Sequence, residues 1–259
     1  MVVILGIGIL LYPSASNYYM YLHQSRAIVE YKENISALDN EDVARMWKEA
    51  EEYNRLLYLA QQAEDIPDDF FANYNNILHV TDDGMMGYIS IPRIKIFLPV
   101  FHGTSDNVLQ KGIGHWEFSS FPVGGANTHA VLTGHNGLTS SRIFTDLEKV
   151  EVGDTFVLQI VGETMTYEVE NIDIVLPNEV DSLSISEGRD LCTLDTCVPY
   201  GVNSHRLLVH GRRIENASEI EADAAEDAGI NALVDLLRMV AIIGAVLLFL
   251  LIFVVRMPK

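Results

Sequence analysis

The stretch from Leu191 to Arg213 constrains the fold more than any other part of the sequence. It reads LCTLDTC, then VPYGVNSH, then RLLVHGRR. The first and last runs read as strands, whereas the middle run holds Pro, Gly, Asn and Ser, which favour turns. Two strands joined in this way pair as an antiparallel hairpin. We therefore expect Cys197 and Arg206 to lie near each other at the neck of this hairpin, where facing side chains come within ~5 Å.

A cysteine beside an arginine points to acyl-transfer chemistry. The permanent cation favours the thiolate, which is the nucleophilic form, and it can stabilise the oxyanion that forms when a thiolate attacks a carbonyl. Without such a neighbour, a lone cysteine in a strand is more often a small buried hydrophobe. Cys192 fits that description, since it is five residues from Cys197 and therefore faces the other side of an extended strand. Their Cα atoms would lie roughly 16 Å apart along the strand, too distant for a disulfide. We therefore predict that Cys197 is the nucleophile and that Cys192 belongs to the core.

Composition excludes some classes of function. The formal net charge of -19 argues against nucleic-acid binding, which needs basic patches. We find no internal repeat, no phosphate-binding glycine loop and no Cys/His cluster with metal-ligand spacing, so we predict neither a cofactor nor a metal. A chain of 259 residues can hold one ample core with appendages at both ends.

Residues 84–214 have the pattern of a β domain. Short runs rich in β-branched and aromatic residues alternate with Gly and Pro signals. Together they predict a mainly β fold, a closed antiparallel barrel. The strand candidates are Gly87 to Ile91, Ile94 to Phe101, His129 to Thr133, Asp154 to Val161, Thr164 to Leu176, Leu191 to Cys197 and Arg206 to Gly211.

The region before the barrel is expected to be helical. Val2 to Leu11 is an apolar run of ten residues, too short for a bilayer core that needs ~20. We interpret residues 1–13 as a truncated first transmembrane helix or signal anchor whose start lies upstream; a short buried helix is the alternative. Residues 14–83 form a helical region in which Ser16 to Glu64 is helix and Asn40 is a plausible N-cap. An apolar face at helical spacing should pack on the barrel, through Val43, Met46, Trp47, Ala50, Tyr53, Leu57 and Ala60.

The region after the barrel predicts a membrane anchor. Residues 215–235 form an acidic tether, and residues 236–255 form an apolar segment that we interpret as a transmembrane helix. The tail, residues 256–259, carries Arg256 and Lys259. Because positive residues stay on the cytoplasmic side, we expect the C-terminus inside the cell and the barrel outside it.

Two motifs show a resemblance to a known family. TLDTC, followed nine residues later by Arg206, resembles the TLxTC…R signature of sortases, the cysteine transpeptidases of Gram-positive cell surfaces. The string PYGVNSHRLLV is similar to the class C branch, which polymerises pilins. An LTGH string ends at His135, where a predicted strand gives way to a glycine-containing loop, and the family's catalytic histidine lies in the same string. We interpret the other candidates as structural, namely His102, His115, His129 and His205.

The resemblance implies a reaction cycle. The Cys197 thiolate attacks the Thr–Gly carbonyl of an LPxTG-like sorting signal, and Arg206 holds the oxyanion, with the backbone or the Thr196 region as a second donor. His135 protonates the leaving amine, and a lysine of the next pilin opens the thioester. The implied partners are pilins or surface proteins with such signals, together with the membrane. Three alternatives stay open: a sortase that attaches proteins to peptidoglycan, a binding module with a degenerate site, and a cysteine peptidase.

Residues 64–76 resemble the lid of pilin-polymerising sortases. That lid lays an aspartate and an aromatic side chain over the active site, usually in the order Asp-Pro-aromatic. Here the order departs from that pattern, because Asp65 precedes Pro67 by two residues and the aromatic Phe70 follows later. We expect Asp65 to approach Cys197 or Arg206, and Phe70 or Phe71 to cover the thiol; an acidic linker is the alternative.

Overall fold

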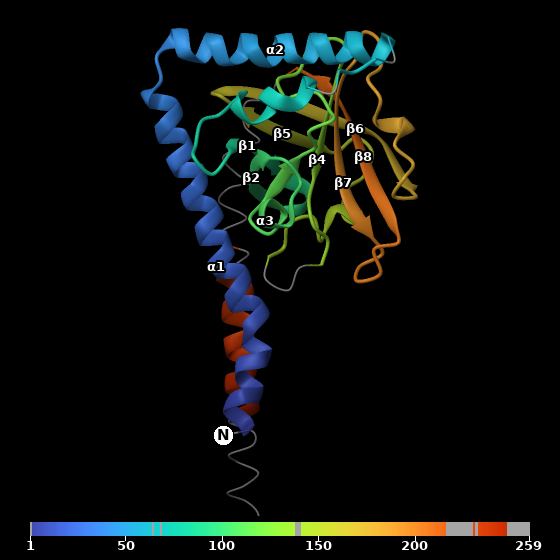
Figure 1. Cartoon of the computed structure of the whole chain (residues 1–259). Coiled ribbons are helices and arrows are strands. Elements are labelled where there is room, and N and C mark those ends of the chain that lie inside the picture. The colour runs from blue at the N-terminus through green and yellow to red at the C-terminus, as the bar shows by residue number, and fades with distance from the viewer. Residues whose placement is uncertain are drawn as a thin grey trace, which may run out of the picture.

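The structure is a computed structural model that describes residues 2–63, 65–67, 69–137, 141–215, 230 and 233–247. Two long helices precede a β-barrel, and a further helix follows it at residues 233–247 (Figure 1). The labelled helices are α1 Val2–Ala37, α2 Asn40–Ala63 and α3 Asp106–Leu109. Short 3-10 turns are η1 Phe70–Asn76, η2 Pro92–Ile94, η3 Leu147–Lys149 and η4 Asp181–Leu183. The strands are β1 Met85–Ile91, β2 Ile96–His102, β3 Ile113–His115, β4 Thr128–Thr133, β5 Thr155–Ile160, β6 Glu163–Val175, β7 Asp190–Val198 and β8 His205–Ile214.

The eight strands close into a barrel in the order β1-β2-β3-β4-β7-β8-β6-β5, and β5 pairs with β1. The predicted closed β-barrel is therefore confirmed, but the prediction that it is antiparallel throughout is wrong. Strand β2 pairs with β3 in parallel, and so does β4 with β7. Both parallel pairs follow from the connections between their strands. Helix α3 lies in the connection from β2 to β3, and strands β5 and β6 lie in the connection from β4 to β7. Strand β3 was not predicted, because three residues carry no readable alternation.

The helical region differs from the prediction at its start and in its middle. Pro13 lies inside α1, so the helix continues past this proline, whereas the interpretation of residues 1–13 as a membrane segment stays a prediction. The helix predicted from Ser16 to Glu64 is interrupted after Ala37, and α2 begins at Asn40. The Oδ1 of Asp39 accepts a hydrogen bond from the Asp42 amide at 2.8 Å, which makes Asp39 the residue that caps α2, in place of Asn40.

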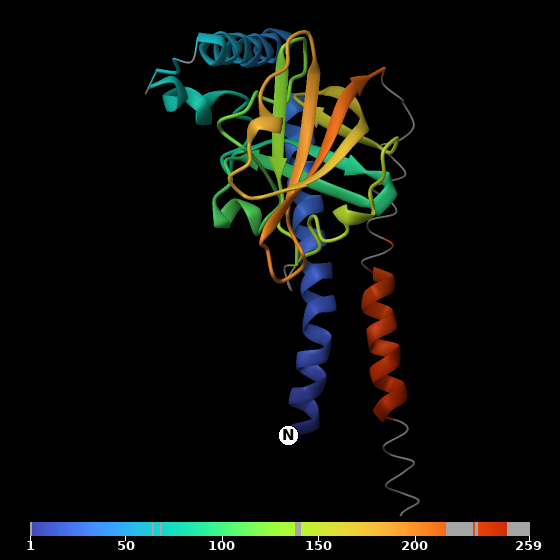
Figure 2. The same ribbon diagram turned by 90° about the vertical axis from the view of Figure 1, so that its right-hand side faces the viewer.

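Helix α2 packs its predicted apolar face on one end of the barrel. Met46, Ala50, Tyr53 and Leu57 are buried in the main core cluster, whereas the opposite face carries exposed charges such as Arg45 and Glu52. In Figures 1 and 2 α2 lies across the top of the barrel, and α1 and helix 233–247 extend away from its lower part. The connection between β7 and β8 lies at this lower end in both views.

Within the described residues, no helix combines the length and apolar character needed to cross a bilayer. The predicted transmembrane segment 236–255 is described only up to residue 247, and the predicted tail 256–259 lies outside the described residues. Most of the predicted tether also lies outside them, namely residues 216–229 and 231–232.

Candidate active site at the ends of β4 and β7

Cys197 and Arg206 meet at the neck of the β7–β8 hairpin, as the sequence predicts. They are direct partners in the antiparallel register. The Nη1 of Arg206 donates to the Cys197 Sγ at 2.7 Å, and both residues are partly exposed. The arrangement supplies a thiol that solvent can reach and a permanent cation in contact with it, which favours the thiolate.

Cys192 occupies the opposite face of β7, as the alternation predicts. It is fully buried in the main core cluster. Burial raises the pKa of the Cys192 thiol well above its usual range, because a thiolate is poorly solvated there. The two cysteines are both free, but only Cys197 is placed for chemistry with an external substrate.

The parallel pairing of β4 with β7 places His135 and Cys197 at the same end of the barrel. The last ladder pair joins Thr133 to Asp195, and the Gly134 amide then donates to the Asp195 carbonyl at 3.0 Å. Two residues beyond the Thr133–Asp195 pair, the same register leads to His135 and Cys197. His135 is partly exposed, so Cys197, Arg206 and His135 gather at one end of three adjacent strands.

Thr196 does not supply its hydroxyl to the site. Its side chain is fully buried, and its Oγ1 donates to the Gly134 carbonyl at 2.7 Å. Strand alternation turns this side chain away from the face that carries Cys197. The hydroxyl instead ties β7 to the backbone beside His135. The expectation that the backbone or the Thr196 region provides a second oxyanion donor stays a prediction.

The loop after β4 contributes a residue that sequence reasoning missed. Asn136 is buried, and its Nδ2 donates to the Cys197 carbonyl at 2.9 Å. Gly134 also matters, because a Cβ there would lie 2.5 Å from the Phe144 ring. Glycine thus allows the Phe144 ring to pack against the backbone directly before His135. The signal was the LTGHNG string itself, in which only His135 was assigned a role.

Asp195 is a second missed residue. It lies two positions before Cys197 and therefore on the same face of β7. Its Oδ2 accepts a hydrogen bond from the Thr133 hydroxyl at 3.2 Å, while its Oδ1 is buried with no hydrogen-bond partner among the described residues. Burial raises the pKa of this carboxyl, and the Arg206 charge and the Thr133 bond act in the opposite direction. Strand alternation alone could have identified it as a neighbour of the site.

The four histidines that we interpret as structural, His102, His115, His129 and His205, all have polar partners in the structure. His115 stacks on Phe121 with ring centroids 5.2 Å apart and has Tyr74 and Ser120 as ring partners; burial lowers its pKa to about 3. His129 is similarly buried, and burial lowers its pKa to about 4. Both rings are therefore neutral at physiological pH. The other two also have polar partners, the Gly84 and Ile77 carbonyls for His102 and the Ser204 hydroxyl for His205.

The lid-like segment lies far from Cys197 in this structure. Phe70 packs on Tyr53 of α2 with ring centroids 4.8 Å apart, and Phe71 packs on Phe118 at 4.9 Å. Residues 65–67 and 69–76 lie beside α2, at the end of the barrel opposite the β7–β8 connection (Figures 1 and 2). The expectation that Asp65, Pro67 and Phe70 cover the site is therefore not met here, because the aromatic contacts hold the segment against α2 and leave Asp65 and Pro67 exposed.

Comparison with known proteins identifies the family of this fold and site. A family model described as "Sortase domain" matches residues 89–214. The crystal structure of sortase C1 from Streptococcus agalactiae is 45% identical with a TM-score of 0.70, over 74% of this chain and 100% of that one. The structure of Clostridium perfringens sortase C with the C-terminal cell wall sorting motif is 40% identical with a TM-score of 0.65, over 74% and 100% of the two chains.

Curated relatives match over a shorter region. Sortase D of Bacillus subtilis is 29% identical over 131 residues, which is 49% of this chain and 63% of that protein. Sortase A of Streptococcus agalactiae is 31% identical over 129 residues, 49% of this chain and 51% of that protein. The match thus spans between half and two thirds of the length of these relatives.

Proposed function

Because the chain belongs to the sortase family of cysteine transpeptidases, we propose that it cleaves an LPxTG-like sorting signal between Thr and Gly and transfers the acyl group to an amine. The contact between Arg206 Nη1 and Cys197 Sγ, at 2.7 Å, carries this proposal. It joins a nucleophile to an oxyanion donor. His135, at the same end of the barrel, supplies the third group that such a reaction needs, a proton carrier.

The first half of the cycle forms a thioester. The Cys197 thiolate attacks the carbonyl carbon of the substrate threonine, and the negative charge moves to the carbonyl oxygen. The Arg206 guanidinium has five N–H donors, so it can contact sulfur with one and the oxyanion with others. The C–N bond to glycine then breaks, and His135 in its protonated form gives its proton to the departing amine.

The second half returns the enzyme to its starting state. An incoming amine attacks the thioester carbonyl, loses a proton to His135 and forms a new amide bond, while Cys197 leaves as the thiolate. We propose that this amine is a lysine of a pilin subunit, so that isopeptide bonds link subunits. The similarity of this chain to sortase C structures covers the whole length of those structures, which supports a pilin lysine as the acceptor. Attachment to a peptidoglycan amine is the alternative, supported by the similarity to a sortase A.

We further propose that the enzyme is anchored in the cell membrane, with the barrel outside and the C-terminus in the cytoplasm. The apolar runs at both ends of the chain and the positive residues Arg256 and Lys259 support this orientation. Protease added to intact protoplasts should cut the chain within residues 215–235. Cutting there that occurs only after lysis would contradict the proposed orientation.

The reaction is tested with the full chain in detergent, an LPxTG-like peptide, and either a pilin lysine peptide or an oligoglycine amine. Intact mass measurement should show an acyl adduct on the wild type and on Cys192→Ala, and none on Cys197→Ala. The product should be an isopeptide with the lysine peptide. Hydrolysis that added amines do not divert would indicate a peptidase, and preference for oligoglycine would favour peptidoglycan attachment.

A further inference from the structure

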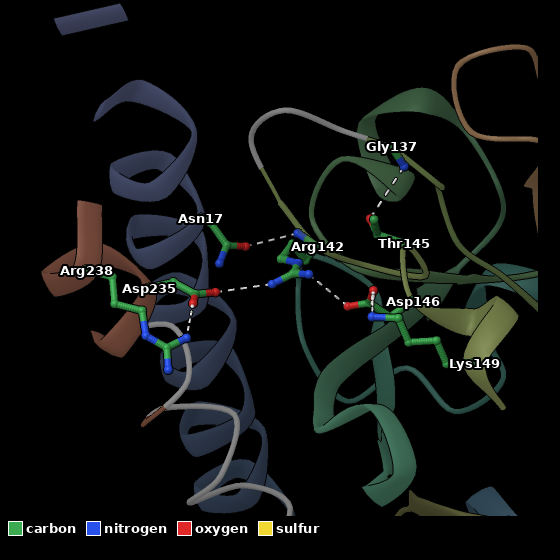
Figure 3. A network of polar contacts seen from close by, with 8 residues as sticks. All are labelled: Asn17, Gly137, Arg142, Thr145, Asp146, Lys149, Asp235 and Arg238. Carbon is green, nitrogen blue, oxygen red and sulfur yellow. Dashed lines mark hydrogen bonds and ion pairs between the residues drawn. The ribbon is translucent and has the colours of Figure 1, made fainter. Parts of the chain in front are cut away.

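The loop that carries His135 is fixed by its own returning limb, residues Ser141–Asp146. The Phe144 amide donates to the His135 carbonyl at 3.0 Å, and the Gly137 amide donates to the Thr145 hydroxyl at 3.4 Å (Figure 3). Phe144 is fully buried against Gly134. The position of the returning limb therefore sets the position of the backbone at His135.

Helix α1 holds this limb from one side. The Asn17 Oδ1 accepts a hydrogen bond from the Arg142 amide at 3.0 Å (Figure 3). Gln24 lies seven residues later, two turns along the same face, and its Nε2 reaches the Ser141 hydroxyl at 3.4 Å and the Lys111 carbonyl at 2.9 Å. Gln24 is buried, so this contact is shielded from water.

Helix 233–247 holds the same limb from another side. Arg142 Nη1 lies 3.2 Å from Asp235 Oδ2, and Nη2 lies 3.1 Å from Asp146 Oδ2. Figure 3 shows the guanidinium between the two carboxylates, with Asn17 on the side of α1 and Arg238 beyond Asp235. Arg142 thus links segments that are remote in sequence, because it contacts Asn17 of α1, Asp146 of its own limb and Asp235 of helix 233–247.

We propose that Arg142 is a positioning residue for His135, and that α1 and helix 233–247 hold the catalytic histidine in place through it. The inference rests on the proposed function, because it assigns His135 the role of proton carrier. Proton transfer to a leaving amine depends on hydrogen-bond geometry, and a small displacement of a catalytic group slows such a step strongly. The two helices that we propose as anchors would thereby set the activity of the barrel as well as its location.

The test compares Arg142→Gln, Asp235→Asn and the double variant in the full chain. The matched control is Arg238→Gln, because Arg238 also pairs with Asp235, at 3.6 Å, but does not contact the loop. Each protein is given two substrates with the same acyl group, an amide peptide and an activated ester whose leaving group needs no proton. Because partly exposed ion pairs are weak, we expect kcat on the amide to fall about two- to fivefold in Asp235→Asn and about tenfold in Arg142→Gln.

The pattern of the losses distinguishes positioning from general destabilisation. Thioester formation from the ester, measured in a single turnover, needs no proton from His135 and should match the wild type in all variants. The double variant should be no slower on the amide than Arg142→Gln alone. Equal slowing on both substrates, or independent losses that multiply in the double variant, would overturn the proposal.

A second measurement does not depend on turnover. Hydrogen exchange of the Phe144 amide, which reports its bond to the His135 carbonyl, should be faster in Asp235→Asn and unchanged in Arg238→Gln. Unchanged exchange in Asp235→Asn would overturn the proposal even if the wild type transferred no acyl group, whereas a wild type that lacks transfer but shows the exchange effect would overturn only the proposed function.

Discussion

Replacing Arg206 with lysine separates the two roles that we assign to this side chain. One guanidinium nitrogen, Nη1, is 2.7 Å from the Cys197 Sγ, which leaves Nη2 and Nε to reach a developing oxyanion. Lysine keeps the charge, but its single nitrogen lacks the planar fork that contacts two atoms at once. Loss of one oxyanion donor typically costs ~10²–10³ in kcat, or about 3–4 kcal/mol. We expect a loss in this range for peptide transfer in Arg206→Lys.

The assay pairs transfer with alkylation of the thiol. Iodoacetamide labelling of Cys197 follows its thiolate and should change far less in Arg206→Lys than transfer does, because the cation is retained. Arg206→Gln, which loses the charge as well, is the matched control and should slow both reactions. Near-normal transfer in Arg206→Lys would refute the role of the fork, and equal losses in labelling and transfer would show that Arg206 only supports the thiolate.

Three further outcomes are expected. Cys197→Ala should abolish the acyl adduct, whereas Cys192→Ala should retain transfer and lose only about 1 kcal/mol of stability in urea unfolding; equal loss of transfer would mean that the strand register is wrong. Burial lowers the pKa of His115 to about 3 and of His129 to about 4, so the free energy of unfolding should fall as pH drops below about 6.5, by roughly 2 kcal/mol per group at pH 5; constant stability between pH 7 and 5 would contradict this. Burial raises the pKa of Asp195, so its contribution is present at low pH and is lost as pH rises above the ordinary aspartate range; Asp195→Asn should therefore be the more stable protein at pH 7, and a less stable variant would contradict the assignment.

The sequence was informative wherever strand alternation decided the outcome. A period of two residues places Cys192 and Cys197 on opposite faces of β7, and turn residues between two strand-like runs place Arg206 opposite Cys197. The same reasoning would have put Asp195 beside the site. For Thr196, the family motif indicated only that its region could help to hold an oxyanion, whereas alternation turns its hydroxyl to the Gly134 carbonyl.

The position of the lid-like segment was not predictable from its composition. Two adjacent phenylalanines and nearby acids describe a segment that needs an apolar partner, but they do not say where that partner is. In the structure the partners are Tyr53 and Phe118. Both are tertiary neighbours, and no local pattern in residues 64–76 indicates them.

The parallel pairing of β4 with β7 is the feature that the sequence did not reveal and that the site requires. His135 follows the end of β4, and Cys197 lies near the end of β7. If neighbouring strands all ran antiparallel, these two ends would lie at opposite edges of the sheet. Because β4 and β7 run in the same direction, their ends meet. Arg206 lies at the start of β8 and reaches the same edge because β8 runs antiparallel to β7. The three groups therefore come together only if β7 has one parallel and one antiparallel neighbour, and the insertion of β5 and β6 between β4 and β7 makes that arrangement available.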